Sequence, residues 1–174
     1  MYLCSDKTYI ITRKKMKKFR EIAGYVLGGL LFVLLIPAVM WFASGRPAVA
    51  YVSVLRASVA ALMMLSGLAM SIWTIVYMRQ HGKGNPMDAF GHEVAPRTQH
   101  LMTDGPYRIN RNPMLTGTLL YLAGFVVLLC TWQAALVWLL FLAIMMVQVI
   151  SEERRLHRDF GQEYDTYRHH TRRF

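Results

Sequence analysis

Two arginines, Arg108 and Arg111, lie in the polar stretch DGPYRINRNPMLTG at residues 104–117, between two very hydrophobic halves of the chain. The stretch ends in Asn112-Pro113, a pair that suits the start of a helix. Asn can cap the first turn, and Pro fits the first helical position, where its missing N–H costs nothing. Arginines near a helix N-terminus favour an anionic group such as a carboxylate or a phosphate.

A second polar stretch contains paired acids, Glu152-Glu153, in SEERRLHRDFGQEYDTYRHHTRRF at residues 151–174. Neighbouring carboxylates favour an ammonium, a hydroxylated sugar or a metal. A zwitterionic ligand would use both the arginines and the acids. The alternative is that these residues pair with one another as a salt-bridged collar at the membrane surface.

Four apolar segments must position these side chains. The chain has 174 residues, of which 55% are hydrophobic, and its mean hydropathy is +0.28. Segments of about 20 apolar residues can cross the ~30 Å hydrocarbon core of a bilayer. The sequence therefore predicts an all-α integral membrane protein of one domain, residues 1–174, with four transmembrane helices at 23–42, 50–78, 113–130 and 134–150.

The last two spans are separated only by Thr131-Trp132-Gln133, so they are predicted to form an antiparallel helical hairpin. In such a hairpin the start of one helix lies beside the end of the other. Arg111 is therefore expected close to the two glutamates. We also expect the fourth helix to continue through residues 152–160 and to break at Gly161.

Basic residues indicate the orientation. Of 20 Lys and Arg, 7 fall in residues 1–21, 5 in the 79–111 loop and 6 in the 151–174 tail. The positive-inside rule places these segments, and both termini, in the cytoplasm, at the inner membrane if the source is bacterial. The 79–112 loop and the tail then form a cytosolic pocket. The net charge of +10 could suggest nucleic acid, but the bases border the spans, so we expect a membrane and no nucleic-acid partner.

Histidines and cysteines do not suggest a metal site. The chain has two cysteines and six histidines, and the latter are scattered over the loop and the tail without ligand spacing. We expect no bound metal.

The two polar stretches resemble the signatures of a known superfamily. GPYRINRNPMLTG is similar to the GPYR-x-x-R-[HN]-P-M-Y-x-G motif of the isoprenylcysteine carboxyl methyltransferases and phospholipid methyltransferases. EERRLHRDFGQEYDTY is similar to their second motif, E-E-x-x-L-x-x-x-F-G-x-E-Y-x-x-Y. The lead-in GKGNP at 82–86 resembles the G-x-G-T-P segment of bacterial members. The resemblance covers residues 79–173, and two long motifs in the right order are specific.

The resemblance implies a membrane enzyme that uses S-adenosylmethionine. By position it implies that Arg108 or Arg111 faces the cofactor's carboxylate and that Glu152 or Glu153 faces its ammonium or ribose. A tail aromatic, Tyr164 or Tyr167, would face the adenine. The full set of cofactor-binding candidates is His100, Gly105, Tyr107, Arg108, Arg111, Asn112, Pro113, Glu152, Glu153, Tyr164 and Tyr167.

The implied reaction transfers a methyl group to a lipidic or amphipathic acceptor that enters from the bilayer, either a phospholipid amine or an isoprenoid-linked carboxylate. Methyl transfer from a sulfonium needs alignment more than acid–base groups, and Arg111 and Glu152 are the best candidates to provide it. No general base is identified. Leu115 stands where the motif has Tyr, and Asn112 favours the bacterial lipid-methylating branch over the prenyl-cysteine branch.

Two other functions remain open. One is an NADPH-dependent reductase of the isoprenoid or sterol type, which shares a related membrane core but has a longer helical bundle. The other is a non-catalytic membrane scaffold whose basic face binds anionic lipid. Nucleotide binding discriminates among all three, and the sequence does not fix the oligomeric state.

Overall fold

The computed structural model describes residues 28–47, 52–81, 88–89, 92–93 and 100–174. The predicted basic tail at 1–21, the first residues of the predicted span 23–42 and the GKGNP segment lie outside the described residues.

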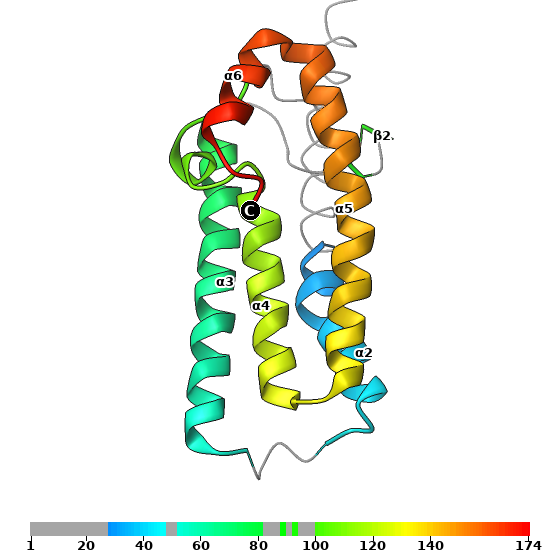
Figure 1. The fold of residues 1–174 in the computed structure, drawn as a ribbon. Coiled ribbons are helices and arrows are strands. Elements are labelled where there is room, and N and C mark those ends of the chain that lie inside the picture. Colours follow the sequence, from blue (N-terminus) through cyan, green and yellow to red (C-terminus); the bar gives the residue numbers. More distant parts are fainter. Residues whose placement is uncertain (1–27, 48–51, 82–87, 90–91, 94–99) are drawn as a thin grey trace, which may run out of the picture.

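Helices make up nearly all of the described structure (Figure 1). A π-helical segment η1 (Leu30–Leu35) leads into α2 (Ile36–Ala43), and α3 (Val54–His81), α4 (Pro113–Leu129) and α5 (Trp132–Phe160) stand side by side. Between α3 and α4 lie a pair of two-residue antiparallel strands, β1 (Asp88–Ala89) and β2 (His92–Glu93), and a 3-10 helix η3 (Gly105–Arg108). The chain ends in α6 (Gln162–His170).

α3 and α4 pack at very close range because small residues face each other along the interface. A Cβ added to Gly67 would lie 2.5 Å from the Gly117 carbonyl oxygen, and one added to Gly124 would lie 2.9 Å from the Ala60 carbonyl oxygen. Close backbone approach through small residues is a common way to pack membrane helices. Of the small residues on α3, Ala60, Gly67 and Ser71 lie in this interface.

The predicted α4–α5 hairpin is confirmed, with a tighter turn than expected. α4 ends at Leu129, and Cys130 follows it in a left-handed conformation. The Thr131 hydroxyl then accepts a hydrogen bond from the Ala134 N–H and so caps α5, which begins at Trp132. α5 continues through Phe160 as predicted. Gly161, with a φ of +51°, then redirects the chain, and α6 folds back toward the start of α4, where Tyr164 contacts Arg111 (Figure 1).

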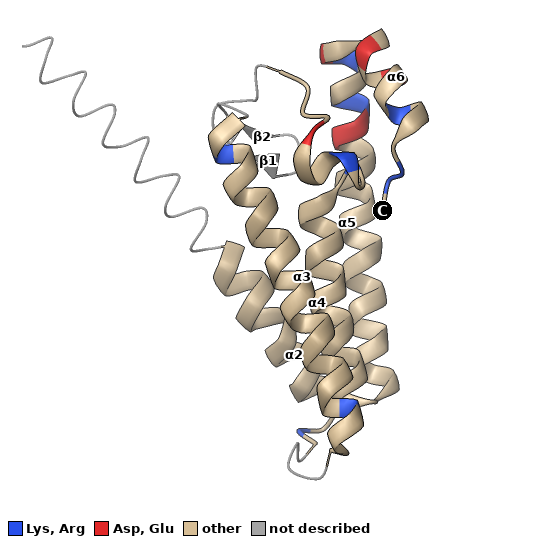
Figure 2. Cartoon of the chain, turned by 90° about the vertical axis from the view of Figure 1, so that its left-hand side faces the viewer, with Lys and Arg blue, Asp and Glu red and all other residues tan. Residues whose placement is uncertain are grey.

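Two helices, α3 with 28 residues and α5 with 29, are long and apolar enough to cross a membrane. The apolar segments Leu30–Ala43 and Pro113–Leu129 are shorter, so four spans remain a prediction. Outside β1 and β2, the acidic and most of the basic residues of the described chain lie at the end of the bundle that carries α6 (Figure 2). Arg46 and Arg56 lie at the opposite end, where α2 ends and α3 begins.

Candidate functional site

Arg111 and Glu153 form an ion pair at the polar end of the hairpin. Arg111 Nη1 lies 3.1 Å from Glu153 Oε1, and the two side chains are only 10% and 12% exposed. The same nitrogen donates a hydrogen bond of 3.2 Å to the hydroxyl of Tyr164, which is 1% exposed. The expectation that the hairpin brings Arg111 to the glutamates is therefore confirmed.

Residues Thr171–Phe174 cross from α6 to the start of α4 and complete this cluster; we name them the strap. The Arg111 backbone N–H donates to the carbonyl oxygen of Arg172 at 2.8 Å, and Asn112 Nδ2 donates to that of Arg173 at 3.2 Å. Asn112 occupies the N-cap position of α4 and Pro113 the first helical position, as the sequence pair suggested, but the Asn112 side chain makes no capping hydrogen bond. Its amide nitrogen instead ties the start of α4 to the strap.

Glu152 faces a different environment from Glu153. Its closest ionic partner in the described residues is Arg155 on the same helix, at 3.4 Å, and its side chain is 41% exposed. Glu152 lines a cavity of about 130 Å³. Burial, and secondly the neighbouring Glu153, raise the pKa of Glu152 above its usual range.

The cavity lies where the polar end of the bundle meets its apolar body. Its lining residues come from α3, from the segment before α4, from α4 and from α5: Met78, Tyr107, Arg111, Asn112, Pro113, Met114, Leu115, Met145, Gln148, Val149 and Glu152. Within the described part of the chain, Arg111 Nε is buried without a hydrogen-bond partner. A guanidinium donor and a carboxylate therefore line one cavity.

Three tyrosines support the walls around this cavity. The Tyr167 hydroxyl donates to the Tyr107 carbonyl oxygen at 2.6 Å, and the Tyr107 hydroxyl donates to the sulfur of Met78 at 3.4 Å. Burial raises the pKa of the Tyr107, Tyr164 and Tyr167 hydroxyls, so all three stay protonated at neutral pH. Tyr164 and Tyr167 themselves line neither this cavity nor the groove described below.

Other predicted site residues lie away from the cavity. His100 and Arg108 are exposed and line neither hollow. Gly105 serves the fold: its φ is +60°, and an added Cβ would lie 2.5 Å from the Tyr77 ring of α3. Of the two arginines that the sequence offered, only Arg111 thus lines the cavity, together with Tyr107, Asn112, Pro113 and Glu152.

Sequence reasoning missed some residues of this site. Met145, Gln148 and Val149 precede Glu152 by seven, four and three positions, so the helical period alone would have placed them on its face of α5. Met78 and Arg173 carried no such signal, because tertiary packing brings them in.

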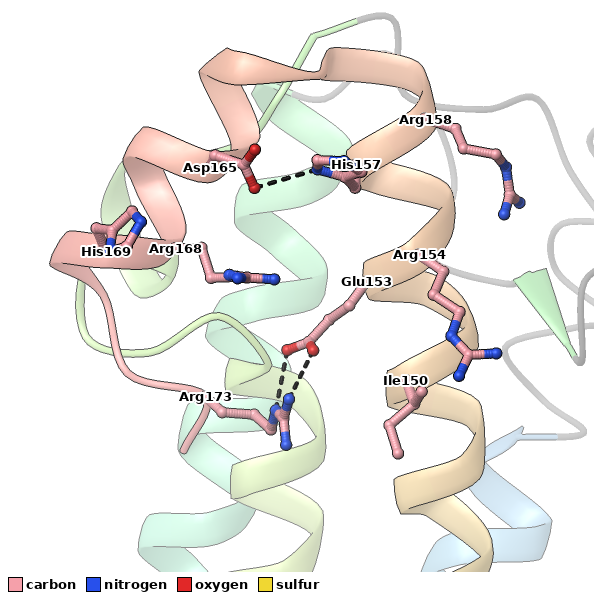
Figure 3. A pocket seen from close by; sticks show the side chains of 9 residues that line it. All are labelled: Ile150, Glu153, Arg154, His157, Arg158, Asp165, Arg168, His169 and Arg173. Carbon is pink, nitrogen blue, oxygen red and sulfur yellow. Dashed lines mark hydrogen bonds and ion pairs between the residues drawn. The ribbon is translucent and has the colours of Figure 1, made fainter.

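A groove of about 730 Å³ lies beside the cluster, between α5 and α6 (Figure 3). Its lining side chains are mostly charged: Ile150, Glu153, Arg154, His157, Arg158, Asp165, Arg168, His169 and Arg173. Both acids are paired, Glu153 with Arg173 and Asp165 with His157 at 3.1 Å. For the guanidiniums of Arg154, Arg158 and Arg168, the described residues provide no hydrogen bond or ion pair. In the residues that the structure describes, no three His, Cys, Asp or Glu side chains group as metal ligands would.

Long apolar helices that end in a polar cluster with a buried arginine and paired acids define an integral membrane protein with a polar site at one end of its helical bundle. A family model described as phospholipid methyltransferase matches residues 55–163, and the chain belongs to that family. Membership makes it a membrane methyltransferase that acts on lipid. Searches of curated proteins and of solved structures gave no significant match.

Proposed function

We propose that the protein transfers a methyl group from S-adenosylmethionine to a lipidic or amphipathic acceptor, and that the cavity between Arg111 and Glu152 holds the amino-acid end of that cofactor. The observation that carries the proposal is that Glu152 and Arg111, whose Nε is buried without a hydrogen-bond partner in the described residues, both line one cavity. A zwitterion with a carboxylate and an ammonium matches these two groups.

The charged groups of the cavity suit the amino-acid end of S-adenosylmethionine, but the volume of the cavity is too small for the whole cofactor. Arg111 Nε needs an acceptor, because a buried donor without one costs about 1–3 kcal/mol, and a cofactor carboxylate would supply it. Glu152 would accept from the ammonium. The cavity, about 130 Å³, is smaller than the ~300–1,000 Å³ of most small-molecule sites, so it accommodates one end of the cofactor.

Glu152 and Glu153 have different roles in this proposal. Glu153 already binds two arginines, whereas the described residues provide Glu152 with one ion pair, at 3.4 Å on its own helix. We therefore assign the cofactor's ammonium to Glu152 and a supporting role to Glu153.

When bound, the cofactor supplies an electrophilic methyl group on a sulfonium. The residues of this chain bind its charged ends, hold it in line with the acceptor and limit access of water. Proximity and alignment are worth several orders of magnitude in such a displacement. Leu115 and Met145 form an apolar wall of the cavity, through which we propose that the acceptor's reactive end arrives from the bilayer.

We further propose four spans, formed by the helix that ends at Ala43 and by α3, α4 and α5, with the polar end in the cytoplasm. α4 has 17 residues, about 26 Å at 1.5 Å per residue, which is close to the hydrocarbon thickness. The acceptor class, a phospholipid amine or an isoprenoid-linked carboxylate, belongs to the same proposal, and family membership favours the phospholipid.

Calorimetric titration of the purified protein with S-adenosylmethionine, its demethylated product and NADPH tests the proposal. We expect both sulfur compounds to bind and NADPH not to bind. Binding of NADPH alone would identify a reductase, and absence of binding by all three would identify a scaffold. Transfer of a radiolabelled methyl group to a total lipid extract, followed by identification of the labelled species, then establishes the acceptor.

A further inference from the structure

Arg173 of the strap makes the most extensive contact with the paired acids. Its Nε donates to Glu153 Oε1 at 3.0 Å and its Nη2 to Oε2 at 2.7 Å, a two-bond arrangement that fixes both partners (Figure 3). Arg111 also pairs with this carboxylate, through Oε1 at 3.1 Å. Glu153 is thus held between two guanidiniums that lie 62 positions apart in the sequence.

This neutralisation matters to Glu152, the next residue. Two adjacent carboxylates repel each other, and a charge on Glu153 disfavours a charge on Glu152. The two arginines offset the charge of Glu153 and thereby lessen this repulsion. The strap also holds the Arg111 and Asn112 backbone and side-chain groups through its carbonyl oxygens.

We propose that Arg173 is a positioning residue for the cofactor site: by binding Glu153 it fixes Arg111 in the cavity wall and keeps the available negative charge on Glu152. This inference rests on the proposed function. Arg173 lies outside the part of the chain that the family model matches, and it does not line the cavity itself. Its effect must therefore pass through Glu153.

Other groups that face Glu152 in the described residues are few. Glu153 and Arg155 share its helix, and Tyr107 and Arg111 come from the segment before α4. α3 and α4 contribute Met78, Pro113, Met114 and Leu115 to the cavity and no charge. Removal of the Arg173 charge therefore acts on Glu152 chiefly through Glu153.

The test compares S-adenosylmethionine affinity, measured by calorimetry between pH 5.5 and 8.5, in the full chain and three variants. Arg173→Gln removes the charge, and Arg173→Lys keeps it without the two-bond geometry. Arg158→Gln is the matched control, because Arg158 lies in the same groove and its guanidinium has no hydrogen bond or ion pair in the described residues.

We expect Arg173→Gln to raise Kd about tenfold at pH 7.5, the loss expected when one charged contact is weakened. Its affinity should also fall off at a higher pH than in the unaltered protein, because Glu152 becomes harder to ionise. Arg173→Lys should keep the unaltered pH profile and lose less affinity, and Arg158→Gln should match the unaltered protein.

Unchanged affinity in a folded Arg173→Gln variant overturns the inference. An equal loss at every pH also overturns it, since that is the signature of a merely structural role. If Arg173→Gln does not fold, Arg173→Lys decides by criteria of its own. Because Lys keeps the charge, its Kd should rise by less than tenfold while its pH profile matches that of the unaltered protein, and either an unchanged Kd or a shifted profile overturns the inference. Failure of the unaltered protein to bind the cofactor is a different result, and it overturns the proposed function together with the inference.

Discussion

The guanidinium of Arg111 lies 3.1 Å from the carboxylate of Glu153, and this pair fastens the open end of the α4–α5 hairpin. Arg111 stands just before α4, and Glu153 stands three residues after Ile150 on α5. Both side chains are nearly buried, so water solvates neither charge well and each depends on the other for its stabilisation. Glu152, one position earlier, turns to the cavity instead. Two adjacent acids of the same type therefore lie in different surroundings.

Loss of the Glu153 charge should mainly lower stability. Glu153→Gln leaves Arg111 and Arg173 without their shared carboxylate, and breaking a buried ion pair on one side costs about 3–5 kcal/mol. Thermal unfolding in detergent micelles should show a clear decrease in the midpoint. The matched control is Glu163→Gln on exposed α6, which has no ion pair in the described residues. Equal midpoints for the two variants would contradict the structural role of Glu153.

Loss of the Glu152 charge should instead lower cofactor affinity. Glu152→Gln keeps the size of the side chain and removes the charge that faces the cavity, so S-adenosylmethionine affinity should fall at least tenfold, about 1.4 kcal/mol or more. The unfolding midpoint above neutral pH should not fall. Normal affinity in this folded variant would place the ammonium site elsewhere.

Because the pKa of Glu152 is raised, both cofactor affinity and the free energy of unfolding should depend on pH, in opposite directions. Binding of an ammonium needs the ionised carboxylate, so affinity should decrease as pH falls through the raised pKa, above the usual range for Glu. Stability responds in the opposite direction: the folded state binds the proton more tightly than the unfolded state, so unfolding free energy from this group decreases as pH rises through the same window. Calorimetry and unfolding measured over one pH series check both signs, and Glu152→Gln should abolish both.

Sequence reasoning succeeded where spacing alone determines geometry. Thr131 and its neighbours allow no connection other than a tight hairpin, and Gly161 marks a break, so the meeting of Arg111 with the paired acids followed from topology. The sequence alone could not predict which of Glu152 and Glu153 faces the cavity. Neighbouring residues of an α-helix are rotated by about 100° from each other, and the exact rotation of α5 decides which carboxylate points toward the cavity. Sequence reasoning also could not find Arg173, since the strap returns to α4 through tertiary contacts that no local pattern encodes.

Close packing of α3 on α4 should be intolerant of added volume. A Cβ at Gly117 would contact the Ser71 hydroxyl and lie 2.6 Å from the Gly67 carbonyl oxygen, so Gly117→Val forces the helices apart. Overpacking of this kind typically costs about 1–3 kcal/mol, and backbone contact on both sides places this site at the upper end. Gly29→Ala is the control, because a Cβ there meets nothing within 4 Å. Similar unfolding midpoints for the two variants would mean that the helices do not meet at Gly117.

Leu115 is the place where this chain departs from the tyrosine of the motif that it resembles, and the structure places it, 8% exposed, in the apolar wall of the cavity beside Arg111 and Glu152. Leu115→Tyr adds bulk and a hydroxyl to a hollow of only about 130 Å³. Because the charged ends of the cofactor contact other residues in our proposal, its Kd should change less than threefold, roughly 0.6 kcal/mol. The KM for the lipid acceptor should rise about tenfold, since the added ring occupies the acceptor's approach.

Leu115→Met conserves volume and should leave both constants near those of the unaltered protein. Radiolabelled methyl transfer at saturating cofactor, with acceptor varied, separates the two constants. If Leu115→Tyr instead weakened cofactor binding and spared the acceptor, the apolar wall would belong to the cofactor, and the acceptor would have to reach the methyl group by another route.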